Sequence, residues 1–245
     1  PGVFGKWSRP NYNTVVATFC HNVARGLPLE IRDPAYAFAL CYIDDVVRSF
    51  MARLEGTAPA GEAPAASGTT CGIDPSYEVS LGWLAGTIRS FAATRQNLTV
   101  PDMGDDLTRK LWATYLSFIP ENKLSYPLRS NVDDRGSFTE FLRSHESGQV
   151  SVNVAKPGIV KGNHWHNTKN EKFLVVSGRA VIRLRRIGTK DVVAYPVSGE
   201  KLEVIDIQPG STHNIENVGE GDLVTLMWAS EPFDPDSPDT YFEKV

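Results

Sequence analysis

The sequence feature that most constrains this chain is a run of residues over 158–178. The run opens and closes with glycine and carries a His-x-His pair, His164 and His166, followed by Glu171. A further histidine, His213, lies in a later segment rich in β-branched residues. The chain has only five histidines, and three of them fall in this pattern. The pattern therefore predicts one shared site rather than scattered imidazoles.

The spacing of these residues predicts that they share a cavity between strands. Alternate residues of a strand point to the same face, so His164 and His166 project together. We expect Glu171 to reach the same cavity from a hairpin partner, and His213 to enter it after the Pro209-Gly210 turn. Three imidazoles and one carboxylate suit a borderline divalent metal such as zinc. The alternative, histidines with ordinary hydrogen-bond partners, is less favoured because four residues obey the pattern together.

The hydrophobic pattern of residues 1–120 mixes helices and strands, with Pro120 marking the boundary. Caps and apolar spacing predict the elements of this part. They are a helix capped by Asn13 or Thr14 that stops before Gly26, a buried strand over 37–43, a helix capped by Asp44 or Asp45 that ends at Gly56, a helix starting at Ser80 and a helix holding Leu107, Leu111, Tyr115 and Phe118. Residues 56–76, rich in Ala, Gly, Pro and Thr, predict a surface loop.

The pattern changes to a period of two in residues 121–245, from about Tyr126 onward. Apolar and polar residues alternate around Val152, and similar short runs surround Ile182 and Thr225. Turn signals separate these runs at 156–158, 188, 198–199, 209–210 and 219–221. Short strands at this spacing predict an all-β sandwich or barrel.

Composition excludes several classes of partner. The net charge is −4, with both signs interspersed, which gives no electrostatic case for nucleic acid or an anionic membrane surface. No apolar run approaches the roughly 20 residues that a membrane span requires. The three cysteines, Cys20, Cys41 and Cys71, lie outside the strand-rich half. With no secretory segment, we expect reduced thiols and a cytoplasmic protein.

Two motifs resemble the cupin superfamily. The run over 158–178 resembles its first motif, and Pro209-Gly210-Ser211-Thr212-His213 followed by Asn217 resembles its second, with Pro-Gly where Pro-x-Gly is usual. Cupins are small antiparallel β-barrels or jelly rolls that often hold a metal. Segments 3–7, 9–13 and 42–47 resemble the last third of an extended short-chain dehydrogenase/reductase (SDR).

With segment 131–140, these motifs resemble the CapF family of bifunctional capsular polysaccharide-synthesis enzymes over nearly the whole chain. The resemblance implies two domains: an α+β remnant of an extended SDR (Rossmann) domain over residues 1–120, and an all-β cupin barrel or jelly roll over residues 121–245. In that family the cupin inverts C3 of a nucleotide-linked 4-keto-6-deoxy amino sugar, and the reductase reduces the C4 ketone with NADPH. The substrate implied here is a UDP-linked 4-keto-6-deoxy-N-acetylhexosamine.

The reductase half lacks two features that its chemistry needs. The sequence has no glycine-rich dinucleotide turn after a strand and no Tyr-x-x-x-Lys pair on a helical pattern. It opens at Pro1 without an initiator methionine, so we interpret it as a fragment. We expect this chain neither to bind NADPH nor to reduce a ketone, NADPH serving only the full-length protein. Asn11, Asn13 and Asp44 are expected to line what remains of the reductase substrate cleft.

The candidate catalytic residues are Lys161, His164 and Lys172. Segment 161–165 resembles the Arg-Gly-x-His-aromatic segment of nucleotide-sugar epimerases, in which the histidine is the base and the basic residue meets phosphate. His164 is also a predicted metal ligand, which leaves its use as the base open. Lys161 or Lys172 can supply an acid, a base or a phosphate contact, and each can equally be a solvated lysine.

Other functions and the oligomeric state also remain open at this level. A cupin with these ligands can be a metal-stabilised module that binds substrate and dimerises without catalysis, or an iron-dependent dioxygenase. We expect a homodimer through the cupin, because the open edges of a small barrel invite strand pairing and an isologous contact closes it.

Overall fold

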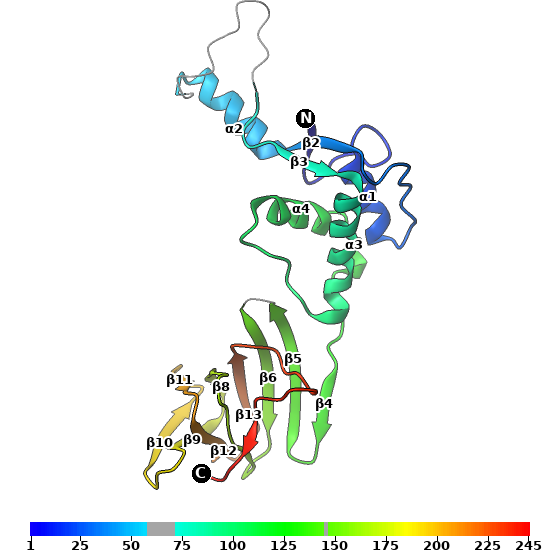
Figure 1. Cartoon of the computed structure of the whole chain (residues 1–245). Helices are drawn as coiled ribbons and strands as arrows, with labels where there is room; N and C mark the ends of the chain where they lie inside the picture. The colour runs from blue at the N-terminus through cyan, green and yellow to red at the C-terminus, as the bar shows by residue number, and fades with distance from the viewer. Residues whose placement is uncertain (58–71, 145–146) are drawn as a thin grey trace, which may run out of the picture. The chain divides into compact units, whose positions relative to one another are not determined.

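The computed structural model describes residues 1–57, 72–144 and 147–245, which form two compact units (Figure 1). The N-terminal unit spans residues 1–96 and 101–126, and the C-terminal unit spans 97–100 and 127–245. The division therefore falls after Tyr126, whereas the sequence places it after Pro120. Cys20 and Cys41 are free and buried, and burial raises the pKa of Cys20 to about 12. Cys71 and positions 58–71 of the predicted loop lie outside the described residues.

The N-terminal unit is a small α+β unit. Its sheet has the order β1 (Gly2–Phe4), β2 (Ala37–Tyr42), β3 (Tyr77–Ser80), with β1 parallel to β2 and β2 antiparallel to β3. The helices are α1 (Val15–Ala24), α2 (Ile43–Leu54), α3 (Leu81–Asn97) and α4 (Asp106–Leu116), followed by the short 3₁₀ helix η1 (Glu121–Lys123). The four helices and β2 confirm the predicted elements, whereas β1 and β3 were not predicted. Buried residues of α1, α3 and α4 pack with β1 and β2 into one core.

Helix α2 shows why the predicted cap was wrong by a few residues. It begins directly after β2, with Tyr42 in the N-cap position, so Asp44 and Asp45 lie in its first turn. Carboxylates there are favourable beside the positive end of the helix dipole. Asp44 is exposed, whereas the side chain of Asp45 is 1% exposed.

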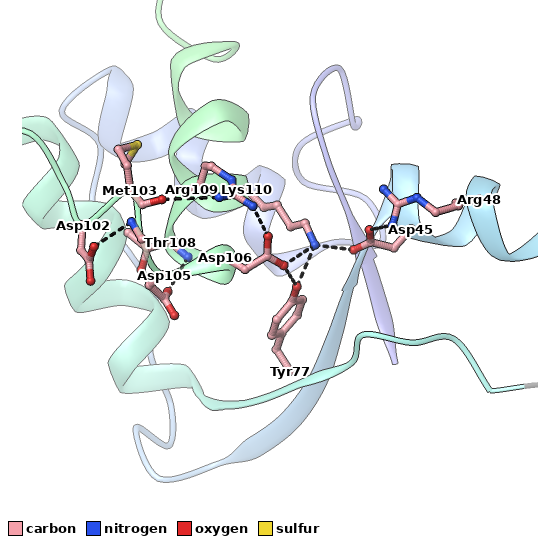
Figure 2. A network of polar contacts seen from close by, with 11 residues as sticks. Asp45, Arg48, Tyr77, Asp102, Met103, Asp105, Asp106, Thr108, Arg109 and Lys110 are labelled. Carbon is pink, nitrogen blue, oxygen red and sulfur yellow. Dashed lines mark hydrogen bonds and ion pairs between the residues drawn. The ribbon is translucent and has the colours of Figure 1, made fainter.

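A charged network connects α2, β3 and α4 of the N-terminal unit (Figure 2). Lys110 donates to Asp45 Oδ2 at 2.7 Å, to the Tyr77 hydroxyl at 2.7 Å and to Asp106 Oδ2 at 2.5 Å. Arg48 donates to the second oxygen of Asp45 at 2.9 Å. Burial alone would lower the pKa of Lys110, but its hydrogen bonds to Asp106, Asp45 and Tyr77 raise it. Lys110 and Arg48 thus stabilise the buried carboxylate of Asp45.

The C-terminal unit contains two antiparallel sheets. One has the order β10-β9-β12-β7-β14 and the other β11-β8-β13-β6-β5-β4. The bounds are β4 (Ser130–Asp133), β5 (Gly136–Ser144), β6 (Gly148–Ala155), β7 (Val160–Trp165), β8 (Glu171–Ser177), β9 (Arg179–Arg186), β10 (Val192–Ser198), β11 (Val204–Ile207), β12 (Ser211–Asn217), β13 (Leu223–Ala229) and β14 (Tyr241–Phe242). Both sheets contribute to one apolar core that includes Phe173, Ile182 and Ile215. Each described strand belongs to one sheet only, so the expected barrel is not closed by a continuous ladder.

Strand β6 has a polarity that its sequence alone does not reveal. Gln149, Ser151 and Asn153 are buried and line a cavity, whereas the alternate valines are only half-buried. The same orientation continues onto β13, where Thr225 pairs with Asn153 and is buried. A polar face turned inward costs free energy unless its groups find partners, and this marks the interior of the unit as a site rather than a plain core.

Candidate metal centre

His164 and His213 lie directly opposite each other on neighbouring strands. They are register partners of β7 and β12, and the pairing is interrupted by a bulge immediately after His213. Gly162 makes this close approach possible. An added Cβ there would lie 2.8 Å from the carbonyl oxygen of His213, and its φ of +99° is in the region that favours glycine. The bulge and the glycine together direct the imidazoles of His164 and His213 toward the same cluster.

His166 and Glu171 complete the cluster from two different sheets. His166 follows the last residue of β7, and Glu171 is the first residue of β8 in the opposite sheet. The expectation that Glu171 belongs to a hairpin partner of β7 is therefore wrong: the connection crosses between sheets. Gly210 of the second motif donates its backbone N–H to the carbonyl oxygen of His166 at 2.7 Å. The two motifs thus meet at this ligand.

The four side chains fit a single metal ion. One ligand atom from each lies within 4.8 Å of all the others. Glu171 Oε2 is 3.2 Å from His166 Nε2 and 3.2 Å from His213 Nε2. Two ligands held about 2.0 Å from one tetrahedral centre lie roughly 3.3 Å apart, which agrees with these separations. His213 Nε2 is buried without a well-formed hydrogen bond, as expected for an atom that needs another partner.

The protonation states of the cluster also suit a cation. Burial, with His213 and His166 close by, lowers the pKa of His164 to about 4. Burial alone would raise the pKa of Glu171, but its contacts with His166 and His213 outweigh that effect and lower it to about 2. At neutral pH the cluster therefore contains a neutral imidazole at His164 and an ionised carboxylate. These are the forms that coordinate metals.

The cluster lines a cavity of about 940 Å³. Phe173 and Ile215 contribute apolar surface, and β5 and β6 contribute several polar side chains. At its rim, Arg143 is paired with Glu140 and Arg135 with Asp133. A metal-ligand set on the wall of a cavity with both apolar and polar lining can position a small molecule beside the ion.

Lys161 bridges the two sheets at this cavity. Its ammonium donates to Asn153 Oδ1 at 2.9 Å, to the carbonyl of Val154 at 2.8 Å and to that of Ser137 at 3.4 Å. Burial lowers the pKa of Lys161. Its three donors are thus directed at protein oxygens, which makes it an anchor between β7 and the β5–β6 pair.

A clasp from the C-terminal segment fixes the loop between His166 and Glu171. The carboxylate of Asp239 accepts backbone N–H groups from Asn167, Thr168 and Lys169, each at 2.8 Å. Its carbonyl oxygen contacts His166 Nδ1. Burial would raise the pKa of Asp239, but the three backbone N–H groups lower it. The side chain and backbone of one residue thereby hold both the loop and a candidate metal ligand.

The other predicted site residues lie elsewhere. Lys172 is exposed on the face of β8 opposite to Glu171, where it pairs with Asp206 of β11. The structure therefore does not bring Lys172 to the cavity, because successive residues of a strand point to opposite faces. Asn11 and Asn13 are exposed in the segment before α1, and Asp44 is exposed on α2.

Sequence reasoning did not identify two residues of the site. Lys169 lies in the loop of the first motif, is 6% exposed and lines the cavity. Asp239 lies far along the chain from the loop that it holds. A loop has no periodicity that reports side-chain direction, and a contact between distant segments leaves no local pattern.

Known proteins match this chain at two levels. The family model described as polysaccharide biosynthesis C-terminal domain matches residues 131–241. The crystal structure of the capsular polysaccharide assembling protein CapF from Staphylococcus aureus is 48% identical, with a TM-score of 0.92, over 100% of this chain and 70% of that one. The chain belongs to the CapF family.

Two further relatives carry names from polysaccharide and nucleotide-sugar metabolism. A UDP-2-acetamido-2,6-beta-L-arabino-hexul-4-ose reductase from Pseudomonas aeruginosa is 44% identical over 98% of this chain. The chain spans 63% of the length of that reductase. The spore coat polysaccharide biosynthesis protein SpsL from Bacillus subtilis is 27% identical over 46% of this chain and 81% of its own length. Among the described residues, no helix is long and apolar enough to cross a membrane.

Proposed function

We propose that the C-terminal unit epimerises C3 of a UDP-linked 4-keto-6-deoxy-N-acetylhexosamine in the biosynthesis of a capsular polysaccharide precursor. The observation that carries this proposal is the candidate metal-ligand set on the wall of a cavity of about 940 Å³ that has both polar and apolar lining. Small-molecule sites typically measure about 300–1,000 Å³. The name of the Pseudomonas relative supports the substrate class, since it describes a UDP-linked, acetamido-substituted 4-ketosugar.

The ion proposed for the site is zinc, held by His164, His166, Glu171 and His213. Nitrogen and carboxylate ligands in a small tetrahedral set favour this ion. When bound, it would supply Lewis acidity beside a ketone oxygen. His164 then serves as a ligand rather than as the base.

Epimerisation beside a ketone requires few groups. The C3–H bond breaks, its electron pair forms a double bond to C4, and negative charge develops on the C4 oxygen. Return of a proton to the opposite face of C3 gives the epimer. Positioned donors in the cavity can stabilise this charge, and Lys161 orients Asn153 within the cavity wall. No redox cofactor is needed for this step.

For the N-terminal unit we propose the substrate-side part of an extended SDR domain, with Asn11, Asn13 and Asp44 near its cleft. NADPH would require the glycine-rich turn that this sequence lacks. A fluorescence titration with NADPH tests this point. We expect no saturable binding to this chain, and binding in the micromolar range would contradict the proposal.

The proposed oligomer is a homodimer formed through the C-terminal unit. The outer face of its six-stranded sheet carries half-buried apolar residues in register across three strands, Leu174, Leu226 and Val152. Burying such a face against a second copy would be favourable. Sedimentation of the 245-residue chain and of its Leu226→Glu variant tests the idea. A dimer that persists in the variant would exclude this face.

Solvent exchange tests the proposed reaction. The 4-keto sugar nucleotide incubated with the chain in heavy water should gain one deuterium at C3, detected by mass spectrometry. The near-complete burial of His166 and His213 also favours a second function, a metal-stabilised module that only binds substrate. Unlabelled sugar recovered from fully metal-loaded protein would select that module. Oxygen consumption with iron bound would instead indicate a dioxygenase.

A further inference from the structure

Three lysines lie within the motif that carries the metal ligands, and their surroundings differ. The ammonium of Lys161 donates to three protein oxygens. Lys172 pairs with Asp206 on the outer face of its sheet. Lys169 lies between His166 and Glu171 and lines the cavity. Only the third combines a position in the cavity with donors that other groups have not taken.

The Lys169 side chain is largely buried, but its ammonium is not fully enclosed and Lys169 lines the cavity. It is 6% exposed, and within the described ranges no hydrogen bond or ion pair involves its ammonium. Removing most of the water around an ammonium is unfavourable unless an anion or a strong acceptor lies close to it. A lysine held in this position therefore points to a ligand oxygen that carries or develops negative charge.

The backbone at Lys169 is fixed independently of any ligand. Its N–H and those of Asn167 and Thr168 all donate to the carboxylate of Asp239. The Thr168 hydroxyl donates to the same carboxylate at 3.1 Å. A loop fixed at four points does not need to reorganise when charge develops nearby, and this preorganisation makes a donor effective in catalysis.

We propose that Lys169 is a catalytic residue whose ammonium donates a hydrogen bond to the C4 carbonyl oxygen of the 4-keto sugar. This inference rests on the proposed epimerisation. As the C3–H bond breaks, its electron pair forms the C3–C4 double bond and the carbonyl π pair moves onto oxygen. The proton leaves to water or a basic group in the cavity and returns from solvent. Lys169 keeps its own protons throughout and stabilises the oxygen electrostatically.

The experiment compares the whole chain with three variants, each loaded with zinc. Lys169→Met keeps the length of the side chain and removes the charge, and Lys169→Arg keeps the charge. Lys190→Met is the matched control, because Lys190 is exposed and lies outside the cavity. The measurements are the rate of C3 deuterium exchange at saturating sugar nucleotide, the affinities for the sugar nucleotide and for UDP alone, the zinc content and the thermal midpoint.

The proposal predicts that Lys169→Met exchanges on the order of 100-fold more slowly at saturation, as when an oxyanion donor is removed. Zinc content and UDP affinity should stay as in the unmodified chain, Lys169→Arg should recover part of the rate, and Lys190→Met should match the unmodified chain. Unchanged exchange in zinc-loaded Lys169→Met would overturn the proposal. Equal weakening of UDP and sugar nucleotide binding with an unchanged saturated rate would also overturn it, since the contact would then be to phosphate.

Failure of the proposed epimerisation is recognised separately, because the unmodified chain would then exchange nothing. In that case the readout is the preference for the 4-keto sugar nucleotide over its C4 alcohol, measured by calorimetry. Loss of this preference in Lys169→Met supports the contact with the carbonyl oxygen, and an equal preference in both proteins overturns it.

Discussion

The two units each bury a polar cluster, and the clusters differ in how they are completed. In the N-terminal unit, Lys110 contacts two carboxylates and a hydroxyl, so positive and negative groups meet inside the protein (Figure 2). In the C-terminal unit, three imidazoles surround Glu171, and His213 Nε2 lacks a hydrogen bond. The first cluster contains its own cation. The second consists of imidazole and carboxylate ligand atoms, and it fits a bound metal cation.

The presence or absence of an internal cation distinguishes the structural network around Lys110 from the candidate metal site, without reference to function. Burial is comparable, since Asp45 and His213 are each 1% exposed. What differs is whether the donors and acceptors of the cluster match one another. A matched network stabilises the fold, whereas an unmatched one in a native protein requires an explanation such as a metal or a ligand.

Disrupting the matched cluster around Lys110 should lower the free energy of unfolding strongly, and by the same amount with and without metal. Among the described residues, Lys110→Met leaves the buried Asp45 with Arg48 as its one cationic partner, so we expect a loss of about 3 kcal/mol in the free energy of unfolding. Urea denaturation with and without a chelator measures this. Combining Lys110→Met with Asp45→Asn should recover part of the loss. A loss that depends on zinc would contradict the separation of the two clusters.

The unmatched cluster should respond strongly to metal. Zinc at about 100 times its dissociation constant should raise the free energy of unfolding of the C-terminal unit by about 2.7 kcal/mol, because only the folded state assembles the ligands. His213→Ala should remove this gain. Calorimetric unfolding with increasing zinc gives the result. A gain retained in the variant would show that the ion binds elsewhere.

Acid should weaken the metal-free C-terminal unit in a defined window. The pKa of His164 is about 4 in the folded protein, against 6.5 ordinarily, so between these values the unfolded chain binds the extra proton. Stability should therefore fall by roughly 2 kcal/mol as the pH drops from 6.5 to 4, allowing for partial exposure. Urea midpoints of chelated protein at several pH values test this. His164→Gln should abolish the effect, and a flat or rising profile would contradict it.

The clasp should tune metal affinity more than fold stability. Asp239→Ala frees the loop before Glu171 and the contact to His166, so we expect zinc affinity to fall about tenfold. Asp236→Ala is the matched control, because Asp236 is an exposed aspartate of the same segment. Competition with a chromophoric chelator measures both. Equal affinities in the two variants would remove Asp239 from the account of the site.

Sequence reasoning recovered the part of the site that follows a strand period. His164, His166, Glu171 and His213 were identified from spacing, and the structure brings their ligand atoms together. The prediction that Glu171 lies on a hairpin partner of the strand carrying His164 was wrong, because spacing does not report which sheet a strand joins. Lys172 was nominated as an adjacent basic residue, but strand alternation turns it outward.

The remaining differences concern interactions between distant segments. Lys169 and Asp239 meet through a loop and a terminal segment, and Asp45, Tyr77 and Lys110 come from three elements of the N-terminal unit. Strand β6 was recognised by its alternation, but alternation does not say which face is inside. The polar face is the inner one here because it lines the cavity.

The histidine cluster should hold one divalent metal ion per chain, and elemental analysis of the protein measures this. Protein purified without chelators and equilibrated with zinc is compared with His166→Ala and with His21→Ala, a histidine outside the cluster. The account predicts near-stoichiometric metal in the unmodified chain and in His21→Ala, and a sharp loss in His166→Ala. Metal content that is unchanged in His166→Ala, or absent from the unmodified chain after equilibration, would contradict it.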